Sequence, residues 1–253
     1  MSVYAINKKF RAVPDAPAGA RPSEARLALR EPQGDPEQGR RVAVAEMFGI
    51  GLDESYEVAL YEGLEVDVRP GDVVFITGPS GGGKSVLLRC LVEAVQASDP
   101  GARIVDLAEA VPPAGIPVMD GLPVPFEAAL RLVSTAGLAD AFLLLRPPEE
   151  LSDGQRWRLR LAHALARLGK SGEAAMRVLV ADELASTLDR LCARAVAYRL
   201  RRLADREGVT VLAASAHDDL IEDLAPDVLI VKEAGSRVLV RYADAARGKG
   251  SVR

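Results

Sequence analysis

The sequence is poor in cysteine, histidine and aromatic residues. Its 253 residues include two cysteines, two histidines and only 4% Phe, Trp and Tyr. Cys90 and Cys192 stand far apart and form no C-x-x-C pair, so neither a disulfide framework nor a zinc site is indicated. We expect both cysteines to be small core residues of a reduced, cytoplasmic protein.

Long apolar stretches and a strong charge excess are also missing. No apolar run approaches the roughly 18 residues that cross a bilayer, and residues 1–20 contain no hydrophobic region of the kind found in signal peptides. The net charge of −4 is too mild to indicate nucleic-acid binding as a bulk property. We therefore expect a soluble protein whose length suits one α/β domain with a small insertion.

The strongest feature is an apolar β-branched run that leads into a glycine-rich loop. Residues 73–88 read VVFITGPSGGGKSVLL and satisfy G-x-x-x-x-G-K-[ST] between a strand pattern and a helix pattern. The glycines let backbone N–H groups turn toward one concavity, and the helix N-terminus adds partial positive charge. Lys84 would reach the β and γ phosphates of a nucleotide, and Ser85 would offer its hydroxyl to Mg²⁺. The predicted phosphate site comprises Gly78, Pro79, Ser80, Gly81, Gly82, Gly83, Lys84, Ser85 and Val86.

Composition changes along the chain indicate its organisation. A short strand pattern over residues 3–13 gives way at residues 14–40 to a stretch rich in Pro, Gly, Arg and Glu, most of which indicates an extended or flexible arm. Strand patterns then recur at 41–45 and 64–68. The expected domains are an N-terminal strand and flexible arm (1–40), the main domain (41–243) with a reduced helical subdomain (111–150), and a C-terminal tail (244–253).

The middle of the chain predicts helices around a proline-rich stretch. A helix over 84–95 should follow the loop, and a strand over 103–107 should come next. A second helix is predicted over 126–136, with Phe126, Ala129, Leu130 and Val133 at the spacing of a buried face.

Four further motifs follow in order. Residues 151–155, LSDGQ, open a helical pattern, although Ser152 and Gln155 by themselves are only a capping box. Residues 178–183, VLVADE, form a buried-strand pattern that ends in two carboxylates. The segment STLD at 186–189 comes directly afterwards, and His217 follows a strand pattern at 209–214.

Taken together, these segments resemble the nucleotide-binding domain of ABC ATPases over residues 41–232. The resemblance implies an α/β fold of the P-loop NTPase type, with a mixed β-sheet flanked by helices and a short helical subdomain. It also implies an enzyme that uses ATP and Mg²⁺. The wording LSDGQRWRLRLA, DELASTLDR and HDDLIEDLAPDVLI is most similar to soluble ABC ATPases that are sometimes fused to a predicted acetyltransferase domain.

The resemblance also implies roles for individual residues. Asp182 and Ser85 would hold Mg²⁺, because hard oxygen donors suit that ion. Glu183 would orient and deprotonate the attacking water, and His217 would contact the γ-phosphate. Ser152, Gly154 and Gln155 would belong to the surface that covers the nucleotide of the opposite subunit in a homodimer, with Asp189 at its interface. His163, inside the same helix as the signature, is expected to be an ordinary structural histidine.

Three aromatic residues are candidates for the face on which the adenine ring stacks. Tyr56 lies 28 residues before Lys84, a spacing comparable to that of the family's adenine-stacking aromatic. Phe48 and Tyr61 are alternatives, and ordinary core packing is an equally good explanation of all three.

Several positions depart from the family's pattern. Asp153 replaces the first glycine of the signature, and Val86 stands where many relatives have threonine. Apart from Gln96, which is too early, no glutamine occurs between Cys90 and Leu151. Met119 or Asp120 is the expected occupant of the missing glutamine's place, and Asp120 would be able to ligate the metal.

These departures leave three interpretations of function. The preferred one is a soluble ATP-dependent dimerisation switch with an unidentified cytosolic partner, because the glutamine is missing and only 65 residues separate Ser85 from Leu151. The alternative is the ATPase subunit of an ABC transporter, although a membrane partner is not expected. A third is a nucleic-acid-associated ABC ATPase, supported by arginines around Trp157 and farther along the chain: Arg156, Arg158, Arg160, Arg190, Arg194, Arg199, Arg201, Arg202 and Arg206.

Overall fold

The computed structural model describes residues 3–12, 44, 47, 56–169, 176–233 and 237–243, with the backbone alone for 3–12 and 56–63. Two compact units are present: Met1–Asn7 with Tyr61–Arg253, and Lys8–Leu60. Strands β1 (Val3–Ala12) and β2 (Tyr56–Asp67) form a two-stranded sheet. The expected arm and tail, and Phe48, lie outside the described residues.

A six-stranded mixed sheet forms the centre of the first unit. Its strand order is β4-β5-β6-β3-β7-β8, and only the β7–β8 pair is antiparallel. Every residue of β3, β5 and β6 is buried, as their continuous apolar runs predict. The strands are β3 (Val73–Thr77), β4 (Arg103–Asp106), β5 (Arg177–Ala181), β6 (Thr210–Ala214), β7 (Val228–Lys232) and β8 (Val238–Tyr242).

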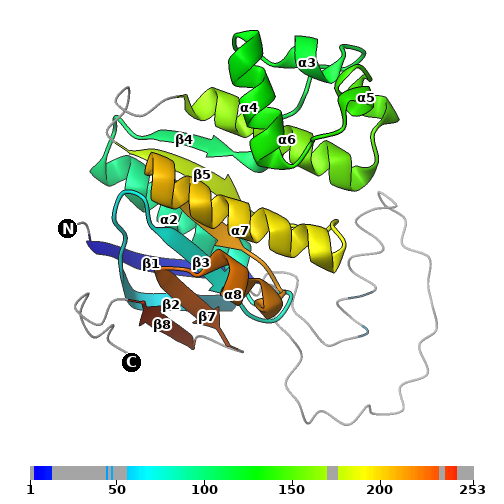
Figure 1. Ribbon diagram of the computed structural model, residues 1–253. Helices are drawn as coiled ribbons and strands as arrows, with labels where there is room; N and C mark the ends of the chain where they lie inside the picture. Colours follow the sequence, from blue (N-terminus) through cyan, green and yellow to red (C-terminus); the bar gives the residue numbers. More distant parts are fainter. Residues whose placement is uncertain are drawn as a thin grey trace, which may run out of the picture. The chain divides into compact units, whose positions relative to one another are not determined.

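Helices connect these strands (Figure 1). The predicted second helix is observed as α4, and α3 contacts both α4 and α5. The reduced helical subdomain over 111–150 stays a prediction. The helices are α2 (Lys84–Ser98), α3 (Val118–Gly121), α4 (Phe126–Ala136), α5 (Ala141–Leu144), α6 (Asp153–Leu168), α7 (Arg190–Glu207) and α8 (Ile221–Leu224). Short 3-10 turns are η1 (Leu107–Glu109), η2 (Pro148–Glu150) and η3 (Asp218–Leu220).

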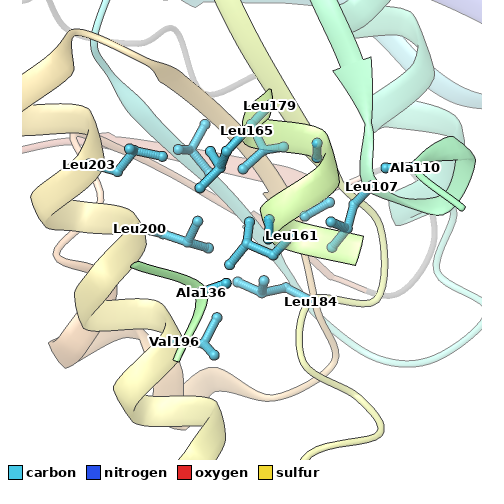
Figure 2. Close-up of a cluster of buried hydrophobic side chains, with 14 of the residues drawn as sticks. Leu107, Ala110, Ala136, Leu161, Leu165, Leu179, Leu184, Val196, Leu200 and Leu203 are labelled. Atoms are coloured by element: carbon cyan, nitrogen blue, oxygen red, sulfur yellow. The ribbon is translucent and has the colours of Figure 1, made fainter. Parts of the chain in front are cut away.

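The main core lies between the sheet and helices α4, α6 and α7. Figure 2 shows Leu161 and Leu165 of α6 beside Leu200 and Leu203 of α7, with Leu179 of β5 in the same cluster. Their burial removes a large apolar area from water and fixes α6 against the strand that carries the two carboxylates.

Two expectations about burial are wrong. Phe126 and Leu130 of α4 are 68% and 39% exposed, whereas Ala129 and Val133 are buried. The helix turns its small residues toward the core, which lets α4 pack closely on α6. Cys90 is buried as expected, but Cys192 is only partly buried.

Across the described ranges, no helix combines the length and apolar character that a membrane crossing requires.

Candidate functional site

The phosphate loop joins β3 to α2, as the sequence predicts. Gly78 has a φ of +139°, and a Cβ added there would lie 2.1 Å from the carbonyl oxygen of Lys232. Gly83, at φ +87°, precedes the first turn of α2. A side chain at Gly78 would force the backbone of Lys232 to move, and one at Gly83 would strain a left-handed conformation, so both positions favour glycine.

Lys84 lies folded against its own loop. Its Nζ donates hydrogen bonds to the carbonyl oxygens of Gly78 at 2.9 Å and Pro79 at 2.8 Å. An ammonium group carries three donors, so these bonds leave capacity for a phosphate oxygen. The same side chain can therefore shape the loop and bind an anion.

The two carboxylates follow β5 in a strained turn. Asp182 accepts a hydrogen bond from the backbone N–H of Glu183 at 3.0 Å. Glu183 has a φ of +50°, in the left-handed region that non-glycine residues seldom occupy. The next residue is anchored, since the N–H of Leu184 donates to the carbonyl of Ala214 at 2.7 Å. Such conformations persist where neighbouring structure holds them, and they cluster at functional sites.

The ends of three strands bring the predicted residues together. Strands β5, β6 and β3 are parallel neighbours, so their carboxyl ends meet at one edge of the sheet. A pocket of about 380 Å³ opens there. It is lined by Ser80, Gly81, Gly83, Lys84, Ser85, Asp182, Glu183, Ser186, Ala214, Ser215, Ala216 and His217.

Some pocket residues were not anticipated from the sequence. Ser215 accepts a hydrogen bond from the N–H of His217 at 3.2 Å and thereby holds the turn after β6. Ser186 lines the pocket beside Glu183. Their signal was present but weak: both are serines within two or three residues of a predicted site residue.

The signature residues form the start of α6 and do not line this pocket. Ser152 caps the helix: its Oγ accepts from the N–H of Gln155, whose side chain accepts from the N–H of Ser152. Asp153 is exposed and pairs with Arg156. Gly154 faces Leu188, in the segment after β5. A Cβ added to Gly154 would lie 3.1 Å from the Cδ2 of Leu188. The aspartate that replaces the first signature glycine is thus accommodated by an exposed ion pair with Arg156 on the same helix.

Asp189 caps the next helix. Its Oδ1 accepts a hydrogen bond from the N–H of Cys192 at 2.9 Å at the start of α7. A hydrogen bond from the thiol of Cys192, followed in size by the one from its backbone N–H, lowers the pKa of Asp189. The residue expected at a subunit interface is therefore held as a carboxylate at a helix N-terminus.

A second pocket, of about 270 Å³, adjoins the first. Asp182 and Glu183 line both, and the second is also lined by Leu107 and Ala108, just after β4. Met119 and Asp120 are in α3 and line neither pocket, so the expectation that one of them takes the missing glutamine's place gains no support. The remaining residues of the second pocket are Asp153, Arg156, Trp157, Arg160, Ser186 and Thr187.

The proposed adenine contact remains a prediction. Tyr56 is the first residue of β2, and its side chain is not among those described.

The sheet and the glycine-rich loop together define an α/β fold of the P-loop type. The chain covers 94% of a dimeric bacterial ABC transporter cassette at a TM-score of 0.58 and 16% identity, with 77% of this chain matched. It covers 83% of CbiO1 from Clostridium perfringens, part of an ABC transporter complex, at a TM-score of 0.53 and 18% identity, with 75% of this chain matched. The expected fold is confirmed: the chain has the α/β P-loop fold with a mixed β-sheet that is seen in ATP-binding cassette (ABC) structures.

Curated relatives agree with this assignment. The methionine import ATP-binding protein MetN of Streptomyces coelicolor is 30% identical over 213 residues, which are 69% of this chain and 58% of that protein. The sn-glycerol-3-phosphate import ATP-binding protein UgpC of Rhodopseudomonas palustris is 31% identical over 200 residues, 69% of this chain and 52% of that protein. The chain thus spans little more than half the length of these two relatives.

The comparisons also bear on the resemblance to one narrower group of ABC ATPases. No protein-family model matches the chain. The likeness to ATPases fused to an acetyltransferase finds no support, because the relatives are import ATP-binding proteins.

Proposed function

We propose that the chain hydrolyses Mg-ATP between two copies of itself and that this cycle powers an ABC importer. One observation carries the proposal. The phosphate loop, the Asp182–Glu183 pair and His217 line a single pocket, whereas Ser152 and Gly154, which would complete the site, lie outside it.

Within the pocket each group has a role that its chemistry supports. Lys84 binds the β and γ phosphates, and Glu183 accepts the proton of the attacking water. Ser85 and Asp182 line the same pocket and present the hard oxygen donors that Mg²⁺ takes when phosphates and water complete its shell. The ion would neutralise charge on the phosphates. His217 stands at the end of β6, where it would contact the γ-phosphate.

A second copy supplies what one chain lacks. Asp182, Glu183 and His217 are exposed, so water would reach the γ-phosphate unless another surface covered it. The start of α6 suits that task, because the Ser152 hydroxyl keeps its own proton to donate while its oxygen accepts from Gln155. The dipole of this 16-residue helix also favours an anion at its N-terminus.

The relatives favour transport over the soluble switch suggested by the sequence. Their descriptions name import of methionine, of sn-glycerol 3-phosphate and of Fe³⁺ ions. Because such different cargoes accompany similar cassettes, the cassette does not specify the cargo, and we assign none. The soluble switch stays as the second candidate, supported by the missing glutamine.

The test is the nucleotide dependence of dimer formation. Glu183→Gln removes the general base and should lower turnover about 10²- to 10⁴-fold while ATP persists at the interface. We expect this variant to be a dimer with Mg-ATP and the wild type mostly a monomer, measured by light scattering after size exclusion. Adding Ser152→Arg to Glu183→Gln should restore the monomer. A monomeric Glu183→Gln at saturating ATP, or a double variant that still dimerises, would argue against the shared site.

A further inference from the structure

Lys232 is a lysine on a buried face. It ends β7, where Val228, Ile230 and Lys232 alternate as the buried positions of the strand. The residue is only 1% exposed and is among the largest fully buried side chains. An apolar residue would be expected at this place in the pattern, because burying a charged group costs free energy unless other groups compensate it.

The position of Lys232 is directly behind the phosphate loop. Thr77 and Val231 are partners in the β3–β7 register, so the next residues along the two strands are Gly78 and Lys232. A Cβ at Gly78 would lie 3.2 Å from the Cβ of Lys232, and one at Gly82 would lie 3.5 Å from its Cγ. The aliphatic stem of Lys232 therefore packs against two glycines of the loop.

The ammonium group is bonded within the chain, on a residue that is almost fully buried. Its Nζ donates a hydrogen bond to the carbonyl oxygen of Glu233 at 3.0 Å. Burial lowers the pKa of Lys232, and the neighbouring Glu233 carboxylate opposes that change. A charge in such a place is screened by salt far less than a surface charge.

We propose that Lys232 is a positioning residue for phosphate binding. Its stem supports Gly78 and Gly82 from behind, and its charge raises the affinity of the loop for polyphosphate without touching the nucleotide. The inference rests on the proposed binding of ATP at this loop. It adds a second cation to the site, behind the backbone rather than in front of it like Lys84.

The test separates charge from packing. Lys232→Met keeps an unbranched stem and removes the charge, and Lys232→Arg keeps a charge. Arg237→Gln is the matched control, since it removes an exposed cation near the start of the neighbouring strand β8. Calorimetry with ATP, ADP and AMP should show that Lys232→Met weakens ATP binding about tenfold, ADP binding less and AMP binding least. Lys232→Arg should recover most of the ATP affinity, and Arg237→Gln should stay within about twofold of wild type.

Steady-state kinetics provide a second readout. In Lys232→Met the KM for Mg-ATP should rise while kcat stays within about threefold, because Lys232 acts on binding and not on the reacting atoms. Equal losses for ATP, ADP and AMP, or a Lys232→Arg variant as weak as Lys232→Met, would show a packing role alone and overturn the proposal.

A measurement on the wild type covers the case in which Lys232→Met does not fold. The ¹⁵N signal of the buried Lys232 ammonium should shift on saturation with ATP and much less with AMP, and equal responses would overturn the inference. If the wild type itself binds no ATP, the proposed function fails instead, so the two failures are distinguishable.

Discussion

Lys84 holds its own loop and is the cation proposed to bind the phosphates, so its removal tests the phosphate site. Lys84→Ala deletes that cation and the two bonds that its Nζ donates to Gly78 and Pro79. We expect ATP binding to weaken by more than about tenfold, measured by calorimetry.

The control for Lys84 lies on the same helix. Arg89 is exposed on α2, and its Nε donates only to the carbonyl of Ser85. Arg89→Ala should bind ATP within about threefold of wild type, a difference of about 0.7 kcal/mol. If Lys84→Ala also stayed within that limit, the phosphate-site assignment would be wrong.

His163 is a second residue whose environment makes a prediction. It is 6% exposed within α6, and its Nε2 has no hydrogen-bond partner among the described residues. Burial lowers the pKa of His163 below its ordinary value. Below a pH of about 6.5 the unfolded chain therefore binds a proton that the folded chain does not, so stability should fall as the pH falls.

Urea unfolding at several pH values measures this effect. Each pH unit below about 6.5 should remove at most about 1.4 kcal/mol through this residue, until the lowered pKa is reached. His163→Leu should lack this contribution, and His217→Gln, which removes the other histidine from an exposed position, should retain it. A pH dependence identical in His163→Leu and wild type would contradict the assignment.

At the scale of elements, the end of α8 carries a strained residue. Ala225 is exposed, has a φ of +41°, and follows the last residue of the helix. Glycine has no Cβ and adopts this conformation without strain, and this relief should exceed its larger unfolded-state entropy, so Ala225→Gly should stabilise the protein by about 0.5–1 kcal/mol.

The matched control is an alanine in an ordinary helical position. Ala195 is exposed in the middle of α7, where Ala195→Gly should cost about 0.5–1 kcal/mol. Thermal unfolding should therefore shift in opposite directions for the two variants, by a few degrees each. Destabilisation by both would contradict the strain at Ala225.

The arginines of α7 are largely occupied within the chain. Arg190 pairs with Asp219 at 3.1 Å, and Arg194 pairs with Asp223 at 2.6 Å. Arg201 pairs with Asp227 at 2.7 Å. These bonds tie α7 to η3, α8 and the start of β7, so three of the six α7 arginines named from the sequence are paired within the chain. The nucleic-acid interpretation loses that part of its support.

At the scale of the whole molecule, the proposal of import requires a membrane partner. A tagged chain isolated from its native cells in mild detergent should recover an integral membrane protein, and more of it in the Glu183→Gln variant with Mg-ATP. Peptide mass spectrometry of the recovered material gives the measurement, and an Arg237→Gln chain serves as a control with an unaltered site. Recovery of only water-soluble partners would favour the soluble switch over the importer.

The sequence by itself determined the elements that depend on local pattern. The strand, glycine loop and helix around Lys84 are encoded within residues 73–98, and the helix at Phe126–Ala136 is predicted with its observed bounds. Periodicity and turn chemistry act over a few residues, which is why these predictions were correct. The same pattern placed Ala129 and Val133 on the buried face correctly and Phe126 and Leu130 wrongly, because the width of the covered face depends on how α4 packs on α6.

Tertiary structure decided what depends on strand order. The sequence separates Lys84 from Glu183 by 99 positions, and they share a pocket because β6 pairs with both β3 and β5. Lys232 lies behind Gly78 for the same reason, since β7 pairs with β3 in a fixed register. Local propensity carries no information on which strands become neighbours. That choice is made by the burial of both sheet faces together, a property of the whole fold and of no single segment.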